Sequence, residues 1–246
     1  MLDWGVGGLG CYRLLRTGWP DVPVVYCSDT GAVPYGRLPH DALRDRVEQL
    51  LLALVERGAT QLVVACHSAS TVIDEVRVPV PTLGMLEASL CMVSHDFAGT
   101  LGILGGQRTI ESERYQTALA RADRSIVARV AQPLSAHIES GLRDAPQFER
   151  DLAEIMAPLH DADAILLACT HYPSIAPQIG ALAPTARLLD PAQALVGELE
   201  RRGALAGGPS GTRFLCTGDP EAMRRAARSA WGVIVEHVQP LQVPER

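Results

Sequence analysis

The sequence contains no lysine, and all 22 of its Lys-plus-Arg positions are arginine. Asparagine is absent as well. Without lysine the chain can form no Schiff base to pyridoxal phosphate, and it has no P-loop lysine for a nucleotide phosphate. Any chemistry on an amino acid would therefore have to proceed without that electron sink.

Other absences narrow the class of protein. No apolar stretch reaches the roughly 18 residues that span a bilayer, and no basic region followed by an apolar core opens the chain. The net charge is −6 without a basic block, so charge does not favour nucleic-acid binding. With 47% hydrophobic and 20% charged residues over 246 positions, we expect a cytoplasmic globular protein of one large domain or two modest ones.

The six cysteines are dispersed and form no CxxC pair. In a reducing compartment they are expected to remain thiols. The spacings Cys66-His67 and Cys169–His171 differ from the pairs usual in closed zinc sites, so we predict no metal. We expect the other four cysteines to be small, buried apolar residues: Cys11, Cys27, Cys91 and Cys216.

Cys66 and Cys169 stand in matched settings. Each directly follows an apolar run, residues 62–65 and 165–168, and each is followed by a polar loop. In open α/β sheets the ligand crevice lies at the carboxyl ends of the strands. Two thiols delivered from two such ends could face one ligand from opposite sides, which suits removing a proton from one face of a carbon and returning one to the other. A buried core cysteine is the plain alternative for either residue alone.

Strands and helices alternate along the rest of the chain, a pattern typical of parallel sheets. Apolar runs predict strands at 22–27, 62–65, 100–104, 125–130, 165–168, 186–189 and 214–217, with a further apolar segment at 78–85. Helical patterns lie at 41–57, from about 109, and at 146–159, 191–201 and 220–229. We predict two similar α/β lobes, each a mostly parallel sheet flanked by helices, with the active site in the cleft between them. The first would comprise 1–91 plus 206–246, and the second 92–205, with the clearest linker at 206–211.

A thiol needs help to act as a base, because its ordinary pKa of about 8.5 leaves little thiolate at neutral pH. A helix N-terminus or a neighbouring histidine raises that fraction. Cys66 precedes a predicted helix start at 68–71, and Cys169 has His171 two residues on. Asp3 and Glu139 are candidate carboxylates for moving protons. Asp3 and His171 could instead be capping or structural residues, and the glycines at 5, 7 and 8 could serve only a tight turn.

Taken together, these segments resemble the glutamate racemases of the cofactor-independent aspartate/glutamate racemase superfamily, over nearly the whole chain. Residues 3–9 are similar to the family's Asp-Ser-Gly-Val-Gly-Gly-Leu, and residues 28–36 to its Gly-Asp-Thr-Ala-Arg-Val-Pro-Tyr-Gly loop. Residues 65–69 stand where the family has Ala-Cys-Asn-Thr-Ala, and 168–173 match its Gly-Cys-Thr-His-Tyr-Pro closely. Weaker matches lie at 109–112 with Tyr115, at 133–141 and at 217–219.

The resemblance implies a two-lobed enzyme that interconverts L- and D-glutamate for peptidoglycan, with no cofactor and as a possible homodimer. Cys66 and Cys169 would be the acid/base thiols, Asp3 would assist Cys66, and His171 and Glu139 would assist Cys169. The remaining residues that it assigns would bind the small-molecule substrate. Tyr35 and Gly36, after Pro34, would bind its side-chain carboxylate, and Ser68 and Thr170 its α-amino and α-carboxylate groups, with Trp4 and His67 beside them.

The chain departs from the family pattern at a few positions. Trp4 replaces a serine, His67 replaces an asparagine, and Gly106 replaces a threonine. Two alternatives therefore stay open: a relative acting on another substrate such as aspartate, a hydantoin or a malonate-type acid, or a binding protein that has lost catalysis. The loop 34–36 favours glutamate, and a decarboxylating relative would be expected to keep one thiol. Because only two residues precede Asp3, we also expect a shortened first strand.

Overall fold

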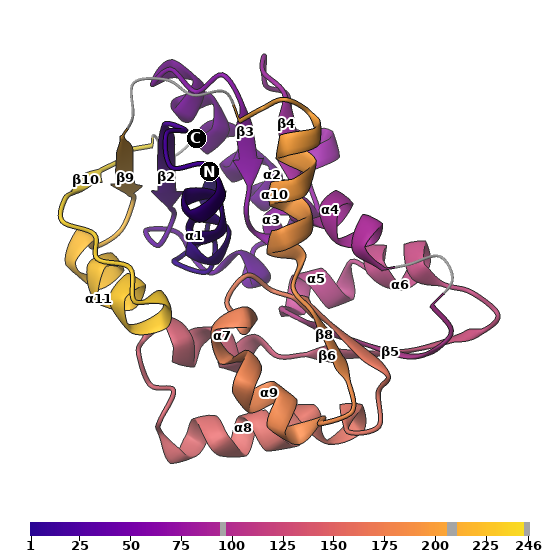
Figure 1. Cartoon of the computed structure of the whole chain (residues 1–246). Coiled ribbons are helices and arrows are strands. Elements are labelled where there is room, and N and C mark those ends of the chain that lie inside the picture. The colour runs from indigo at the N-terminus through magenta and orange to yellow at the C-terminus, as the bar shows by residue number, and fades with distance from the viewer. Residues whose placement is uncertain (94–96, 206–210, 244–246) are drawn as a thin grey trace.

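The computed structural model describes residues 1–93, 97–205 and 211–243, and its strands form two parallel sheets (Figure 1). The six-stranded sheet has the order β10-β9-β2-β1-β3-β4 and the four-stranded sheet the order β6-β5-β7-β8. The first sheet consists of β1 (Leu2–Asp3), β2 (Val24–Ser28), β3 (Leu62–Val64), β4 (Thr82–Gly84), β9 (Thr212–Cys216) and β10 (Val238–Pro240). The second consists of β5 (Gly99–Gly105), β6 (Arg124–Val130), β7 (Ala164–Ala168) and β8 (Arg187–Leu189). The predicted fold class, parallel sheets flanked by helices, is confirmed.

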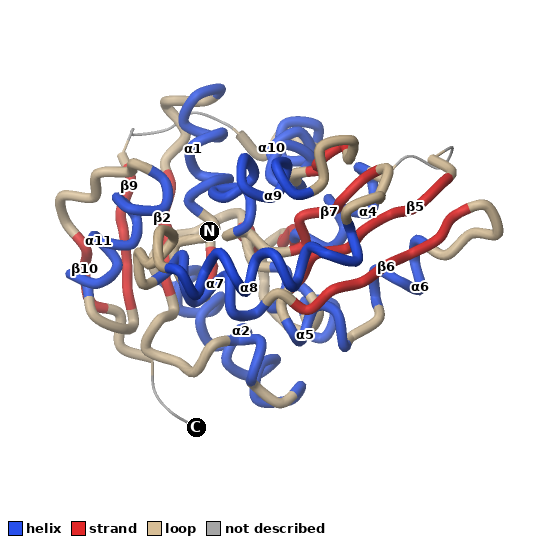
Figure 2. The backbone as a smooth tube through the Cα atoms, turned by 90° about the horizontal axis from the view of Figure 1, so that it is seen from below, coloured by secondary structure: helices blue, strands red, loops and turns tan. Residues whose placement is uncertain are grey.

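Helices cover the faces of both sheets, and Figure 2 shows the strands as two groups with helices around them. They are α1 (Leu9–Gly18), α2 (His40–Glu56), α3 (His67–Ser70), α4 (Met85–Met92), α5 (Gln107–Glu111), α6 (Arg114–Leu119), α7 (Gln132–Glu139), α8 (Pro146–Met156), α9 (Ala176–Leu182), α10 (Pro191–Arg201) and α11 (Pro220–Trp231). Short 3₁₀ turns occur at Tyr35–Arg37, Ile73–Glu75, Ala157–Leu159 and Tyr172–Ile175. Because helices cover both faces, the central strands are buried on two sides and carry continuous apolar runs.

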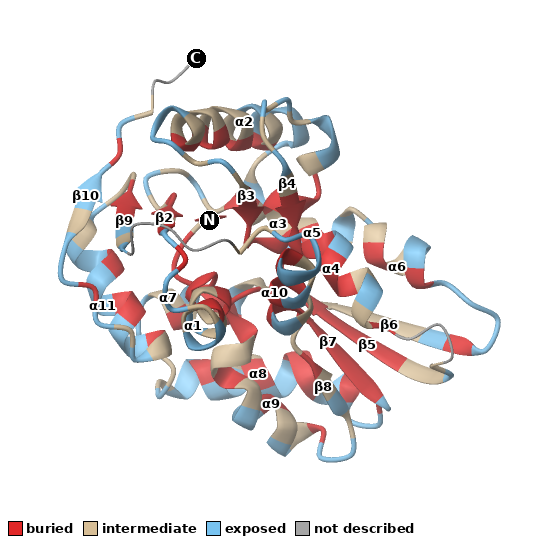
Figure 3. Ribbon diagram, turned by 45° about the horizontal axis from the view of Figure 1, so that its top comes forward, coloured by how far each residue is buried: buried red, intermediate tan, exposed pale blue. Residues whose placement is uncertain are grey.

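The strands that lead to the two cysteines are fully enclosed. Every residue of β3 and β7 is buried, and Figure 3 shows both strands in the buried colour. The helices are amphipathic by comparison: α2 buries Leu43, Val47 and Leu50 on one face and leaves its other face to solvent. One apolar cluster also continues from the first sheet to the second, since Tyr26 of β2 and Leu167 of β7 belong to the same core. The two lobes therefore share packed core as well as a cleft.

Helix α10 packs on the first sheet, and this packing bears on where along the chain the second lobe ends. It begins after Asp190, whose side chain accepts the N–H of Ala192 as an N-cap. Its buried face, including Leu195 and Leu199, packs in one cluster with Val63 of β3 and Leu83 of β4. The chain thus returns to the six-stranded sheet before the predicted linker, of which residues 206–210 lie outside the described residues. We propose a lobe boundary at Asp190.

Strand β1 is short and lies between β2 and β3. Leu2 pairs with Cys27 and Val64, and Asp3 pairs with Ser28. A cavity of about 530 Å³ lies at the amino ends of these strands, and Met1, Val24 and Val63 are among the residues lining it. This cavity is therefore at the opposite end of the sheet from Cys66. Within the described ranges, no helix combines the length and apolar character needed to cross a membrane.

Candidate active site

A small cavity lies where the carboxyl ends of β3 and β7 face each other across the cleft. Its volume is about 40 Å³. All predicted site residues except Glu139 line it: Asp3, Trp4, Pro34, Tyr35, Gly36, Cys66, His67, Ser68, Cys169, Thr170 and His171. Gly106, Thr109, Gln132, Ser135 and Ala168 complete its wall. The first lobe contributes Cys66 and the second Cys169, so the topology brings the two matched thiols to one space.

Cys66 is positioned by the turn from β3 into α3, of which it is the N-cap residue with extended backbone. Its side chain is buried, and this burial raises the pKa of the thiol well above its ordinary value, with the nearby Asp3 charge adding to the effect. Asp3 lies at the end of the neighbouring strand β1, and its carboxylate is close enough to the Cys66 thiol for the two groups to shift each other's pKa. The Cys66 side therefore couples a buried thiol to a buried carboxylate.

Asp3 itself is held by backbone donors. Its Oδ2 accepts the N–H of Gly8 at 2.7 Å, and its Oδ1 accepts the N–H of Trp4 at 2.9 Å. Burial raises the pKa of Asp3, while the charge of His171 and the Gly8 hydrogen bond oppose that rise. Capping the glycine-rich turn therefore accounts for only some of the contacts of Asp3, because its carboxylate also lies beside the Cys66 thiol.

Cys169 has a different neighbour. Its sulfur lies 3.7 Å from Nδ1 of His171, and it is only partly buried. Nε2 of His171 lies 2.6 Å from Oε1 of Glu139, which also accepts the N–H of Val6 at 2.6 Å. Burial alone would lower the pKa of His171, but its hydrogen bonds to Cys169 and Glu139 and the Glu139 charge raise that pKa well above its ordinary value. Glu139 thus reaches the site through His171.

The glycine-rich turn at 5–8 lets the two lobes interlock. A Cβ atom on Gly5 would lie 1.7 Å from Oε1 of Glu139, and one on Gly7 would lie 2.5 Å from Oγ1 of Thr170. Thr170 Oγ1 in turn donates to Asp3 Oδ2 at 3.4 Å, which links the two sides of the site. These glycines therefore serve more than a tight turn: they make space for the other lobe's polar side chains.

The loop carrying Tyr35 and Gly36 is anchored by a buried carboxylate. Tyr35 Oη donates to Asp29 Oδ2 at 2.7 Å, and Arg46 Nη2 lies 2.6 Å from Asp29 Oδ1. Asp29 is fully buried, and Thr217 also donates to it at 2.6 Å. Sequence reasoning named neither Asp29 nor Arg46 as a site residue, although Asp29 lies inside the motif 28–36.

Trp4 and His67, which replace smaller residues of the family pattern, have different hydrogen-bond partners. The indole Nε1 of Trp4 donates to the carbonyl oxygen of Ala32 at 3.1 Å, so its polar edge turns to the loop that precedes Tyr35. His67 is buried, and its Nδ1 lies 2.6 Å from Oη of Tyr115. Ser68 Oγ lies 3.3 Å from Oγ1 of Thr109, across the cleft.

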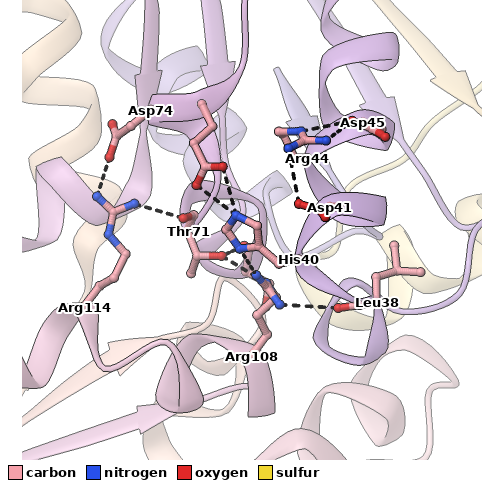
Figure 4. Close-up of polar contacts among 11 residues, drawn as sticks. Leu38, His40, Asp41, Arg44, Asp45, Thr71, Asp74, Arg108 and Arg114 are labelled. Carbon is pink, nitrogen blue, oxygen red and sulfur yellow. Dashed lines mark hydrogen bonds and ion pairs between the residues drawn. The ribbon is translucent and has the colours of Figure 1, made fainter.

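A second set of contacts between the lobes lies beside the site, near the surface (Figure 4). Arg108 of α5 donates to Thr71 Oγ1 at 3.2 Å, and its Nη2 lies 2.7 Å from Nδ1 of His40. Arg114 of α6 bonds Asp74 in the same region. These side chains line an open cavity of about 490 Å³ with charges of both signs. The lobes are therefore joined both by the buried glycine turn and by an exposed polar cluster.

Comparisons with known proteins agree with this geometry. A model of the Asp/Glu/Hydantoin racemase family matches residues 12–199. A curated glutamate racemase from Pseudomonas aeruginosa is 32% identical over 246 residues, covering 94% of this chain and 93% of that protein. The crystal structure of glutamate racemase from Thermus thermophilus in complex with β-chloro-D-alanine has a TM-score of 0.85 at 33% identity, covering 98% of this chain and 94% of that one. A structure from Francisella tularensis, in complex with D-glutamate, shares the fold with a TM-score of 0.87 at 22% identity, over 98% of this chain and 96% of that one. The chain belongs to the Asp/Glu/Hydantoin racemase family and is an isomerase of the glutamate racemase type.

Proposed function

We propose that this protein interconverts L- and D-glutamate without a cofactor, using Cys66 and Cys169 as the two acid/base groups. The observation that carries the proposal is that the two thiols, delivered by strands of different lobes, line one cavity, each with its own proton-handling partner. The relatives from Pseudomonas aeruginosa and Thermus thermophilus are named glutamate racemase, which supports glutamate as the substrate. A D-glutamate supply made in this way would serve peptidoglycan synthesis in the cytoplasm.

The charges of the site favour one resting protonation state. Burial and the Asp3 carboxylate keep Cys66 as the thiol, because both raise its pKa. A protonated His171, held by Glu139 at 2.6 Å, places a positive charge beside the Cys169 sulfur. In that state Cys169 is ready to take the α-proton and Cys66 is ready to give one.

The reaction then proceeds by proton transfer at the two faces of the α-carbon. The Cys169 thiolate takes the α-proton from one enantiomer, and the Cys66 thiol delivers its proton to the opposite face, leaving the other enantiomer. Asp3 and the His171–Glu139 pair move the protons that reset the two thiols. In the reverse direction Cys66 is the base, and Asp3 accepts the proton of its thiol.

The substrate's other groups meet the remaining lining residues. Ser68 and Thr170 bind the α-amino and α-carboxylate groups, and the loop at 34–36 binds the side-chain carboxylate. A cavity of about 40 Å³ holds roughly three water molecules, far less than the ten heavy atoms of glutamate. The lobes therefore have to move apart to admit the substrate, and they close on it afterwards.

Optical rotation tests the substrate directly. The purified protein, with no cofactor added, is incubated with L-glutamate and separately with D-glutamate, and polarimetry follows each solution. Loss of rotation from both enantiomers to zero is the expected result. If neither solution changes while L- or D-aspartate does racemise, the assignment of glutamate is wrong and the acid/base roles stand. If no acidic amino acid racemises, both are wrong.

A further inference from the structure

Gln132 lines the cleft but has no part in the proposed reaction. It is the first residue of α7, in the second lobe, and it lines the same cavity as Cys66 and Cys169. The residue is only half-buried. Its amide can both donate and accept hydrogen bonds, so what it offers to a ligand depends on which way the amide is turned.

Two neighbours fix the orientation of this amide. The backbone N–H of Gln107, which can only donate, lies 3.2 Å from Oε1 of Gln132. Ser135 Oγ donates its only proton to the main-chain carbonyl oxygen of Gln132 at 2.9 Å, so it can only accept from the amide. Nε2 of Gln132 donates to that hydroxyl at 3.1 Å. The amide oxygen is therefore held towards the start of α5, and the amide nitrogen towards Ser135.

A glycine at the start of α5 makes room for the amide oxygen. Gly106 is the N-cap residue of α5 and has no side chain to cap the helix, and Oε1 of Gln132 accepts the first N–H of the helix in its place. A Cβ atom on Gly106 would lie 3.1 Å from Oε1, so the threonine of the family pattern would crowd the amide. The glycine at 106 and the glutamine at 132 are thus matched to each other.

A second glycine brings the amide against the loop that is assigned to the side-chain carboxylate of the substrate. A Cβ atom on Gly36 would overlap Oε1 of Gln132, and Nε2 lies 3.6 Å from the same point. The amide of the second lobe therefore lies directly against the main chain of this first-lobe loop. Nε2 carries two protons, and one of them is used on Ser135. For the other proton, the residues that the structure describes provide no acceptor.

We propose that Nε2 of Gln132 donates its second N–H to the side-chain carboxylate of the substrate, beside the main chain of Gly36, and that Gln132 is a specificity-determining residue. The inference rests on the proposed function. With its oxygen held at α5, the amide has only a donor left for a ligand, and a carboxylate only accepts. A hydrogen bond to a charged acceptor is stronger than one to a neutral acceptor, so the amide favours a carboxylate over the carboxamide of glutamine.

Exchanging the amide for a carboxylate tests this role. Gln132→Glu keeps the shape of the side chain and the oxygen that caps α5, but it replaces the donor with a negatively charged acceptor. We expect KM for D-glutamate to rise by about tenfold or more, with kcat changed less than about threefold. D-glutamine, measured as a competitive inhibitor of D-glutamate racemisation, should bind at least as tightly as it binds the unsubstituted protein, because its carboxamide can donate to the new carboxylate.

Two further variants complete the experiment. Gln132→Met removes both polar atoms at similar length, so we expect KM for D-glutamate to rise about tenfold and the inhibition constant of D-glutamine to rise less than about threefold. Gln178→Glu is the control, because it places the same charge at an exposed position of α9 and should leave both constants unchanged. If Gln132→Glu does not fold, the unequal losses in Gln132→Met decide the question.

The comparison of the two ligands separates this inference from a structural role and from the function on which it rests. Equal losses for D-glutamate and D-glutamine would mean that Gln132 supports the fold or meets the α-carboxylate that both ligands share, and the proposal would be wrong. Unchanged constants in both variants at position 132 would overturn it as well. If the unsubstituted protein does not racemise glutamate, the proposed function fails, and the role of Gln132 fails with it.

Discussion

The two halves of the site deliver their thiols in the same way but surround them differently. Cys66 and Cys169 both follow buried strands, β3 and β7, at the edge of the cleft. Cys66 is buried beside the carboxylate of Asp3, whereas Cys169 is partly exposed beside the imidazole of His171. A negative neighbour favours the thiol and a positive neighbour favours the thiolate. The halves are therefore alike in backbone and opposite in charge, which equips one thiol to give a proton while the other takes one.

The halves also differ in what holds their partners in place. Asp3 is fixed within its own lobe by the N–H groups of Gly8 and Trp4. Glu139 belongs to the second lobe, yet its carboxylate accepts the N–H of Val6 from the first. The Cys169 half is thus tied to the first lobe through the backbone of Val6, while the Cys66 half is tied to the second lobe through the longer contact of Asp3 with Thr170 at 3.4 Å.

Replacing either thiol should have the largest effect. We expect Cys66→Ser and Cys169→Ser each to lower kcat/KM for racemisation by roughly 10²- to 10⁴-fold, because a serine hydroxyl is a far weaker acid than a thiol. Steady-state polarimetry measures the loss. Cys91 was predicted to be buried, but it is exposed, and it does not line the cleft, so Cys91→Ser should leave the rate unchanged. Normal racemisation by both cleft variants would show that the thiols are not the acid/base groups.

Replacing the partners should expose the difference between the halves. We expect Asp3→Asn and His171→Gln each to lower kcat/KM by about 10²-fold. The two enantiomers must lose kcat/KM equally, since the equilibrium constant of racemisation is one. The asymmetry should appear in the α-deuterium isotope effect, which should grow for one enantiomer in Asp3→Asn and for the other in His171→Gln. Growth for the same enantiomer in both variants would contradict the division of the site into two halves.

Crowding the glycine turn should disturb mainly the Cys169 half. In Gly5→Ala the new methyl would lie 1.7 Å from Oε1 of Glu139, so the carboxylate must leave His171 or Val6. We expect the free energy of unfolding to fall by about 1–3 kcal/mol, with roughly tenfold lower kcat/KM. Urea titration and polarimetry measure the two effects. Gly18→Ala, at a position with open space around it, is the control, and equal losses in both variants would argue against this interlock.

The last prediction concerns stability, not catalysis, and follows from the pKa of the buried His67. The unfolded chain binds a proton at this residue below about pH 6.5, while burial lowers the pKa in the folded protein to about 3. Between these values the unfolded state holds more protons, so the free energy of unfolding falls as pH falls, by up to about 1.4 kcal/mol per pH unit. In His67→Asn this contribution should vanish, and urea titrations from pH 7 to pH 4 would show a shallower decline. Equal slopes in both proteins would mean that His67 takes up its proton while folded.

The sequence predicts the fold well where burial leaves a strong pattern. The runs 62–65 and 165–168 read as strands because residues buried on both faces are continuously apolar, and both strands are present. The helix at 191–201 was predicted with the bounds that α10 has, since Asp190 and Pro191 mark its start. Helices α4, α7 and α9 were not predicted, because they are short and their local patterns are weak.

The candidate site is predictable to the extent that strand ends and motifs identify it. The cleft residues came from their positions after strands and from the family resemblance. The hydrogen bonds that set their chemistry were out of reach: Tyr115 lies 48 positions from His67, and Val6 lies 133 from Glu139. Such contacts depend on how the lobes pack, which no local pattern encodes. For the same reason the sequence could not show that Trp4 turns its Nε1 to Ala32.

The central claim is that the two thiols act on opposite faces of one carbon, and solvent exchange by the single-thiol variants tests it most directly. Cys66→Ser and Cys169→Ser are each incubated in D₂O with L- and with D-glutamate, and NMR follows the α-hydrogen of each enantiomer. Each variant keeps one base, so we predict that one exchanges the α-hydrogen of only one enantiomer, the other that of only its mirror image, and neither inverts. Exchange of the same enantiomer by both variants, or of both enantiomers by either one, would contradict the account.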